Sequence, residues 1–208
     1  MATGGVTVRY RSLVSDRGDQ TRGRAMDSAI ALFSKRGWSG FTIHAVAQMS
    51  RVSLGSLYHH FGSMDGLAAA TWSRSLTRLL DALAHACASK RTARTSVEAL
   101  VVGYLDFTER RRPEALFIHA ASWASFLVEH AERLGAEKAR AFEPLLTHFA
   151  RYVAEGAVVR ASPSMLEMLL IGPAAETSRR WLALDPSIDL DEARRVLPAA
   201  TWRSVVGR

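Results

Sequence analysis

Residues 42–67 read TIHAVAQMSRVSLGSLYHHFGSMDGL, and this stretch decides how the chain folds. Thr42 and Ser53 are each suited to cap the start of a short helix, because a side-chain oxygen at that position accepts a free backbone N–H. A turn at residues 50–52 separates the two helices, and the second ends near His60. Two short helices joined by a tight turn suit the reading of duplex DNA, since the first braces the second and the second fits a major groove.

The second of these helices has one apolar side and one small, polar side. Leu57 and Phe61 are four residues apart and are expected to pack inward with Val52. Glycine and serine on the opposite side let a helix backbone approach DNA closely. The outward positions are Gly55, Ser56, His59 and His60.

Residues 21–67 resemble the DNA-binding domain of the TetR family of transcriptional regulators. The family pattern runs approximately T-(V/I)-x-x-I-A-x-x-A-G-V-S-x-G-T-L-Y-x-H-F-x-S-K-E-x-L, and this chain follows it in the same register. Upstream, residues 29–33 and 37–38 match the family's first helix. The residues that match the pattern are Thr42, Ile43, Val46, Ala47, Val52, Ser53, Gly55, Ser56, Leu57, Tyr58, His60, Phe61, Ser63, Asp65 and Leu67.

Three positions depart from the family pattern. Ser50 and Arg51 stand where Ala-Gly is usual, so a turn that favours glycine must accommodate a side chain, at a cost of about 1 kcal/mol. Met64 replaces a lysine that grips phosphate in the family, and this loss should weaken nonspecific affinity for DNA. The rest of the motif keeps the resemblance intact.

The resemblance implies a role for each residue of the motif. Thr42, Tyr58 and His60 would contact phosphates, although for Tyr58 packing is compatible with that contact. His44 is explained equally well by a base contact and by a solvated surface position. Leu54 cannot hydrogen-bond a base, so it is expected to touch a thymine methyl group. The complete set of expected DNA-binding residues is Thr42, His44, Arg51, Leu54, Gly55, Ser56, Tyr58, His59 and His60.

The charge of the chain is concentrated at its N-terminal end. The protein has 208 residues and a formal net charge of +7, and residues 1–62 hold eight Lys or Arg against three Asp, which is +5 of that total. A basic segment on a nearly balanced body suggests that the segment binds a polyanion, although a solubilising tail would have the same composition.

Helical spacing extends over nearly the whole chain, so we expect an all-α protein. A long helix should run over 64–88, and further helices are expected at about 95–110, 113–123, 136–156, 163–184 and 190–205. Pro144, Pro173 and Pro198 fall inside these patterns and should bend or break them. The expected organisation is a flexible basic arm at 1–20, a three-helix DNA-binding domain at 21–63, and a larger helical domain for ligand binding and dimerisation at 64–208.

The larger domain is expected to hold a small-molecule effector and to pair with a second copy of the chain. Both roles follow from the resemblance, and the alternative for each residue is packing in the monomer's own core. Sparse charge on the inward helix faces suggests an apolar or aromatic ligand. Pocket candidates are Trp72, Tyr104, Phe107, Phe117, Trp123 and Phe149, and dimer candidates are Leu166, Leu169, Gly172, Pro173, Thr177, Trp181, Val196 and Leu197.

Other classes of function find little support in the sequence. The histidines form no cluster at metal-site spacing, no glycine-rich phosphate loop or nucleophile motif appears, and a lone Cys87 is expected to be a buried thiol. We therefore expect no metal, no cofactor and no catalysis. No apolar stretch approaches the roughly 18 residues of a membrane span. A cytoplasmic protein is expected, with no membrane partner.

The sequence thus predicts a DNA-binding transcriptional regulator, a repressor by default, that a small molecule releases from its operator. The competing hypothesis is a helical ligand-binding adaptor or carrier in which the motif is degenerate and no longer binds DNA. Arg51 and Met64 are the residues that favour the second hypothesis.

Overall fold

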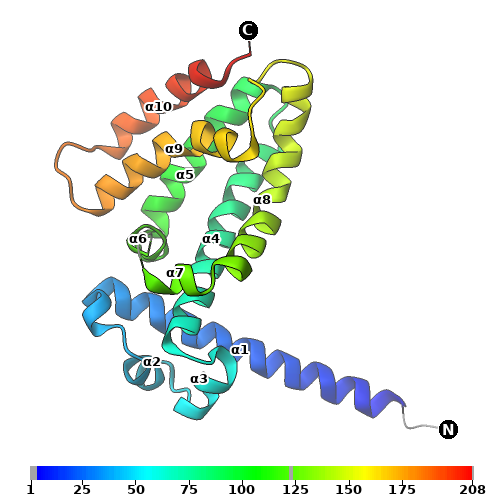
Figure 1. Ribbon diagram of the computed structural model, residues 1–208, viewed down its shortest axis with the longest axis vertical. Coiled ribbons are helices and arrows are strands. Elements are labelled where there is room, and N and C mark those ends of the chain that lie inside the picture. The colour runs from blue at the N-terminus through cyan, green and yellow to red at the C-terminus, as the bar shows by residue number, and fades with distance from the viewer. Residues whose placement is uncertain (1–3, 122–123, 208) are drawn as a thin grey trace.

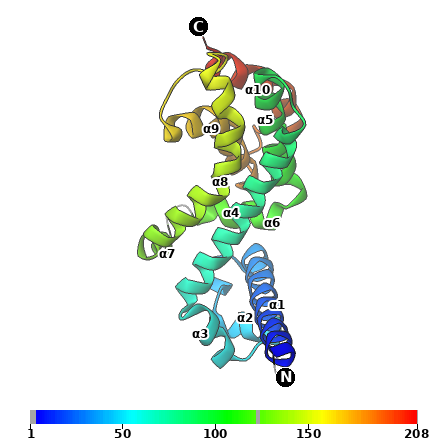
Figure 2. The ribbon, with the colours of Figure 1, turned by 90° about the vertical axis from the view of Figure 1, so that its right-hand side faces the viewer.

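The computed structural model describes residues 4–121 and 124–207, which fold into helices joined by loops, with a single isolated β-bridge between Val158 and Val206. A small group of helices forms one end of the molecule and a larger bundle forms the other, and α4 runs from one to the other (Figures 1 and 2). The elements are α1 (Gly4–Arg36), the 3-10 turn η1 (Trp38–Gly40), α2 (Ile43–Ser50), α3 (Leu54–Phe61), α4 (Met64–Ala88), α5 (Ala93–Arg110), α6 (Arg112–Ala120), α7 (Ser125–Glu129), α8 (Ala131–Ala154), α9 (Pro163–Leu182) and α10 (Leu190–Val205). The expected all-α fold, with an N-terminal helix-turn-helix and a larger helical domain, is confirmed.

The first helix begins much earlier than expected. Residues 4–20, for which we expected a flexible arm, are part of α1, whose N-terminal half projects past the rest of the molecule in Figure 1. Thr21 lies inside this helix, and its hydroxyl donates to the carbonyl of Arg17 at 2.8 Å, one turn earlier. No proline interrupts this stretch, and extending a nucleated helix is far easier than starting one.

The core of the N-terminal end extends beyond residue 63, where we expected the domain boundary. It is built from α1 to α3, from Leu67 and its neighbours at the start of α4, and from Phe117, Phe126 and Leu134 of α6, α7 and α8. Phe117 is fully buried, and its ring centroid lies 5.0 Å from that of Phe33 on α1. The N-terminal end is therefore joined to the bundle by shared aromatic packing.

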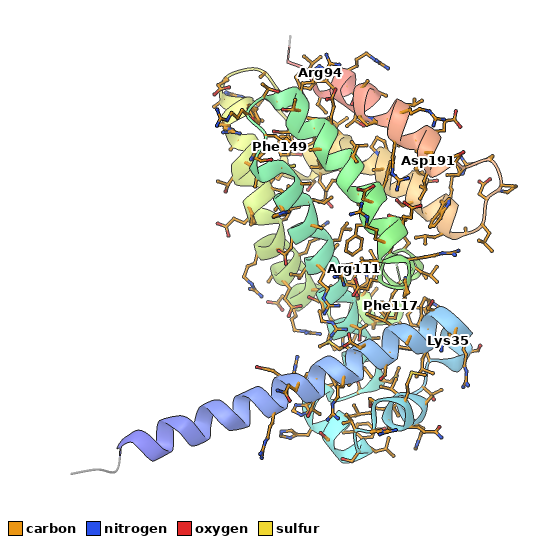
Figure 3. The ribbon with its side chains drawn as sticks, turned by 180° about the vertical axis from the view of Figure 1, so that it is seen from behind. Lys35, Arg94, Arg111, Phe117, Phe149 and Asp191 are labelled. Carbon is orange, nitrogen blue, oxygen red and sulfur yellow. The ribbon has the colours of Figure 1, made fainter. Side chains whose placement is uncertain are left out.

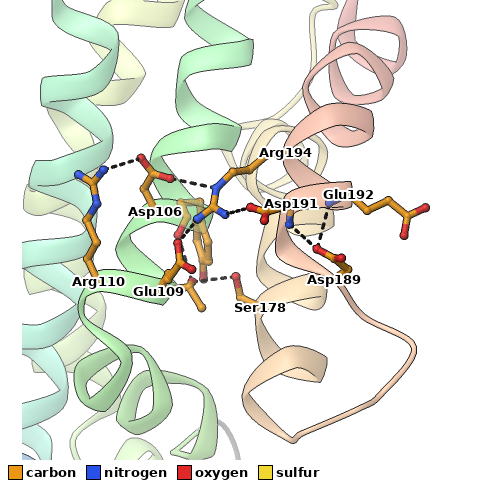
Figure 4. A network of polar contacts seen from close by, with 10 residues as sticks. Asp106, Glu109, Arg110, Ser178, Asp189, Asp191, Glu192 and Arg194 are labelled. Carbon is orange, nitrogen blue, oxygen red and sulfur yellow. Dashed lines mark hydrogen bonds and ion pairs between the residues drawn. The ribbon is translucent and has the colours of Figure 1, made fainter.

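The larger bundle has a second core, formed by α4, α5, α6, α8, α9 and α10. A polar network at its edge joins α10 to α5 (Figure 4). The Arg194 guanidinium lies 3.1 Å from a carboxylate oxygen of Asp106 and 2.7 Å from one of Asp191, and it also pairs with Glu109. The hydroxyl of Thr108 donates to Ser178 at 2.8 Å and joins α5 to α9.

Several helix boundaries differ from those that the sequence predicts. The helix expected at 136–156 begins at Ala131, and the short α7 before it was not expected. Pro144, Pro173 and Pro198 lie inside α8, α9 and α10, and none of the three helices ends at its proline. Packing of these long helices against their neighbours outweighs one lost backbone hydrogen bond in each.

Candidate nucleic-acid interface

The turn between α2 and α3 is shaped by a cap on each side. The Thr42 hydroxyl accepts the N–H of Ala45 at 3.2 Å, and the Ser53 hydroxyl accepts the N–H of Ser56 at 3.2 Å. Between them Arg51 ends α2 in the left-handed conformation, with φ 55° and ψ 36°. That is the conformation for which the family pattern uses glycine, so the side chain at this position introduces local strain.

Two of the three residues predicted to face inward are buried, whereas Phe61 is half-buried, as are Ser56 and His60, which were predicted to face outward. Leu57 is fully buried and Val52 is 5% exposed, while Phe61 is half-buried beneath the Arg22 guanidinium, 5.3 Å from the centre of its ring. Tyr58 is 51% exposed although it is a large aromatic residue. The other expected DNA-binding residues divide into exposed ones (Thr42, His44, Arg51, Gly55 and His59) and half-buried ones (Leu54, Ser56 and His60).

No described neighbour of Gly55 requires the residue at this position to be small. A Cβ added at this position would meet no described atom within 4 Å, and Gly55 is in ordinary helical geometry. Neither packing nor backbone conformation therefore requires glycine here. An open position on the exposed side of α3 is what close approach to another molecule needs.

His59 and His60 are adjacent on α3, with ring centroids 5.3 Å apart. Partial burial, then the neighbouring His59 and Arg22, hold the pKa of His60 below its ordinary value. The lowered pKa favours the neutral form of the His60 ring, which has one N–H donor and one nitrogen acceptor. Among the residues that the structure describes, no three His, Cys, Asp or Glu side chains gather as a metal site would require.

Among the predicted pocket residues that the structure describes, Phe149 borders the apolar cavity of the bundle, and the others lie in the cores or at the junction of the two ends. Phe117 belongs to the N-terminal core, and Trp72 donates its ring N–H to the carbonyl of Ile118 at 3.4 Å at the same junction. Tyr104 and Phe107 are buried in the bundle core, as is Cys87, whose pKa burial raises to about 12. Trp123 lies outside the described residues. Figure 3 shows Phe117 close to α1 and Phe149 far from it, inside the bundle.

Phe149 lines an apolar cavity of about 400 Å³ between α5, α8 and α9. Helical spacing indicates which aromatic residues face inward but does not show which of them border empty space. The aliphatic residues that line the cavity were therefore not predicted from the sequence. Two charged residues, Arg160 and Glu167, are part of the lining, and Glu167 is paired with Lys138 at 2.7 Å. The remaining lining residues are Leu100, Phe142, Leu145, Leu146, Ala150, Val153, Ala154, Pro163, Leu166, Leu170 and Ile171.

The dimer candidates also separate into two groups. Leu166 is 9% exposed and forms part of the cavity wall, so it serves the chain's own core. Of the others, Leu169, Trp181 and Leu197 pack partly against the bundle core. The exposed Met165 and Met168 of α9 are not among the residues expected from the sequence. Pro173 and Val196 are exposed, and those half-exposed are Leu169, Gly172, Thr177, Trp181 and Leu197.

A capped helix-turn-helix with an exposed second helix, carried on a helical bundle that encloses an apolar cavity, defines a DNA-binding transcriptional regulator. The family of "Bacterial regulatory proteins, tetR family" matches residues 25–71. The regulator BetI of Paraburkholderia phymatum is 27% identical over 151 residues, which are 71% of this chain and 76% of that protein. Further BetI regulators from Burkholderia species align over about half of their length.

Solved structures give the same assignment of the fold. A TetR family transcription regulator from Marinobacter aquaeolei superposes with a TM-score of 0.76 at 15% identity, covering 93% of this chain and all of the other. FadR of Bacillus subtilis, solved in complex with stearoyl-CoA, superposes with a TM-score of 0.68 at 12% identity, covering 87% of this chain and 97% of the other. Residues 25–71 of this chain therefore match the DNA-binding domain of the TetR family, and its described fold is that of solved TetR-family regulators. None of its described helices is long and apolar enough to cross a membrane.

Proposed function

We propose that this protein is a homodimeric repressor that acts on DNA in the cytoplasm and leaves its operator when an apolar small molecule fills the cavity between α5, α8 and α9. The observation that carries the DNA-binding half of the proposal is the outward face of α3. It combines an exposed Tyr58 with a glycine whose small size nothing in the described protein requires.

The residues of this face would divide the work of binding. Phosphate contacts position a protein on the duplex without reading its sequence, whereas contacts to base edges specify the site. We assign Thr42, Arg51, Tyr58 and His60 to the first task. We assign His44, Leu54, Gly55 and Ser56 to the second, with His59 at the boundary.

A second copy of the chain would dock on α9 and α10. Among the exposed residues of these helices are large apolar ones, with Met165 47%, Met168 65% and Val196 53% exposed, and Gly172 would let two helices approach closely. Exposed apolar side chains of this kind favour an interface. A two-fold dimer presents two copies of α3, which fit the two half-sites of a near-palindromic operator.

The effector would be largely apolar, with one polar or charged end near Arg160. A cavity of about 400 Å³ lies within the range of small-molecule sites, and its wall is aliphatic and aromatic apart from two side chains. The charge of Glu167 is already paired with Lys138, so Arg160 is the group suited to an anionic or strongly polar end.

The signal would pass from the cavity to the DNA-binding end through α8. This helix supplies Phe142, Leu145 and Phe149 to the cavity wall, and its Leu134 is 4% exposed in the N-terminal core. No residue of α4 lines the cavity, but α4 packs against both α5 and α8, so a movement of either cavity-lining helix would be passed on to it. A shift of α8 would change the separation of the two copies of α3 and disfavour docking on half-sites at a fixed spacing.

Selection of genomic fragments by the purified protein tests the proposal directly. We expect a short, near-palindromic site whose affinity falls steeply as salt rises, because phosphate contacts release counterions. An effector found afterwards should bind more weakly when operator is present, by the same factor by which it weakens operator binding. Equal effector affinity with and without operator would rule out the coupling through α8.

The competing function is a ligand carrier that no longer binds DNA, and the strained Arg51 is the observation that favours it. The same selection separates the two functions. A protein that takes up an apolar ligand and enriches no fragment, at any salt concentration, would be a carrier.

A further inference from the structure

A second cleft, separate from the apolar cavity, lies where the DNA-binding end meets the bundle. It has a volume of about 490 Å³ and is lined by α1, α4 and α8. Both α1 and α8 pack against α4, and in Figure 1 the lower end of α8 lies on the other side of α1 from α3. The lining residues are Arg22, Met26, Ala70, Ser73, Arg74, Thr77, Arg133, Glu137, Arg140 and Ala141.

Four arginines from three different helices converge on this cleft. The only carboxylate in the lining is Glu137, which accepts a hydrogen bond from Ser73 and pairs with Arg133 at 3.3 Å. Asp27 lies beside the cleft and pairs with Arg74 at 2.7 Å. Counting these two acidic residues against the four arginines leaves a formal charge of +2 at one concave site.

The arginines differ in how much of their charge is already compensated. Arg22 donates to the carbonyl of His60 at 3.2 Å, which is a neutral acceptor. Arg140 is exposed and makes no ion pair or hydrogen bond within the described part of the chain. Two of the four cations therefore meet no carboxylate.

Arg74 is the most enclosed of the four, with 18% of its side chain exposed. Its terminal nitrogens reach Asp27 and the carbonyl of Gly23, but its Nε is buried and has no acceptor among the described residues. Burial lowers the pKa of this guanidinium, and the neighbouring Asp27 offsets the effect only in part. A half-buried cation with incomplete compensation raises the electrostatic potential of the cleft around it.

We propose that this cleft binds a small polyanion with phosphate-like oxygens, such as a phosphorylated metabolite, held between Arg133 and Arg140 of α8 and Arg22 and Arg74 of α1 and α4. Guanidinium groups match such oxygens in charge and in paired geometry. An anion in this place would tie α8 to α1, and so would set the orientation of the DNA-binding end independently of the apolar cavity.

Calorimetric titration with inorganic pyrophosphate, at an ionic strength matched with sodium chloride, tests this site without any operator. We expect one saturable site per chain. The double variant Arg133→Gln, Arg140→Gln should bind pyrophosphate at least about tenfold more weakly, because two charge-assisted contacts are lost. The matched control is Arg91→Gln, Arg203→Gln, which removes the same charge from exposed positions outside the cleft and should leave the affinity unchanged.

Three outcomes would overturn the proposal: no saturable binding, an equal loss in both double variants, or displacement of pyrophosphate by a random-sequence duplex. The second outcome would mean that only the net charge matters. The third would mean that the arginines of the cleft contact the DNA backbone. We expect the double variant to fold, because the Arg133–Glu137 pair that it removes lies at the surface, with 45% and 27% of the two side chains exposed. Circular dichroism of each variant checks this.

Discussion

At residue scale, Gly55 and Arg51 lie four positions apart and each stands where folding alone would favour another residue. Gly55 occupies the first turn of α3 with open space around it, where alanine would fit. Arg51 has a φ of 55°, where glycine would fit. Two residues that do not suit their own backbone conformation, in the same short motif, are typical of a binding site. At such a site a residue is kept for the contact it makes, although another residue would make the fold more stable.

Replacing Gly55 by alanine should stabilise the protein by about 0.5 kcal/mol, since alanine loses less backbone entropy in a helix. The added methyl group would hold α3 away from the groove, so operator affinity should fall at least about tenfold. Urea denaturation and operator titration measure the two effects. Unchanged operator affinity would mean that Gly55 does not face DNA.

Replacing Arg51 by glycine should also stabilise the protein, by about 1 kcal/mol, because glycine adopts the left-handed conformation without strain. The lost cation should weaken binding to all duplexes alike. It should also reduce the magnitude of the slope of log affinity against log salt concentration by about one. A change in base preference instead would place Arg51 at a base edge.

His119 should make the fold sensitive to acid. Burial, with a smaller contribution from Arg179, lowers the pKa of His119 to about 4, although Glu176 acts in the opposite direction. An unfolded chain with an ordinary histidine pKa of about 6.5 binds the proton first, so stability is full above that pH and falls as the pH drops toward 4. The loss reaches about 3 kcal/mol at most.

The variant His119→Gln keeps a polar group next to the Tyr104 hydroxyl, 3.3 Å from the His119 ring nitrogen, but cannot titrate. It should lose correspondingly less stability than the wild type between pH 6.5 and pH 4, as measured by denaturant unfolding at each pH. Parallel stability curves would show that His119 is protonated as readily in the fold as in the unfolded chain.

At element scale, α10 is held on α5 by a single cation shared among three carboxylates. Arg194 is 20% exposed and joins Asp106, Glu109 and Asp191 (Figure 4). Such a network holds its partners more firmly than an isolated surface pair, because the cation is partly withdrawn from water. It matters for function because α10 forms part of the proposed dimer face.

Replacing Arg194 by methionine should lower the free energy of unfolding by about 1–2 kcal/mol, since the three carboxylates lose their shared cation and, among the described residues, only Asp106 keeps another partner, Arg110. The control is Arg94→Met on α5, which breaks an exposed pair with Glu98 and should change stability by less than about 0.5 kcal/mol. High salt should narrow the difference between the two variants. If Arg194→Met lowered the free energy of unfolding by no more than Arg94→Met does, Arg194 would contribute no more than an ordinary surface residue.

At the scale of the whole molecule, the proposed operator binding requires two chains acting together. Val196 on α10 is 53% exposed within the proposed dimer face, and Val128 on α7 is 81% exposed outside it. The two valines therefore form a matched pair for testing assembly, since arginine at either position is tolerated by the isolated chain.

Val196→Arg should yield a monomer, because two like charges would meet in an apolar interface, and operator affinity should fall at least about a hundredfold. Val128→Arg should remain dimeric and keep its operator affinity. Sedimentation equilibrium and operator titration give both readouts. A dimeric Val196→Arg protein would place the interface elsewhere.

The local sequence by itself determined the helix-turn-helix. Its caps at Thr42 and Ser53, its buried Leu57 and its strained Arg51 depend on residues only a few positions apart, so spacing predicts them correctly. For the same reason the long helix from Met64 to Ala88 was predicted to the residue. Such features need no knowledge of the rest of the chain.

The tertiary structure alone decided which inward residues border a cavity and which fasten the two ends together. Phe117 and Phe149 lie on similar apolar helix faces, but Phe117 packs against α1 and Phe149 lines the cavity, because their partners come from distant parts of the chain. The arginine cleft likewise gathers residues between positions 22 and 140. Periodicity reports which side of a helix is buried, whereas the identity of the opposing surface depends on how the helices pack in space.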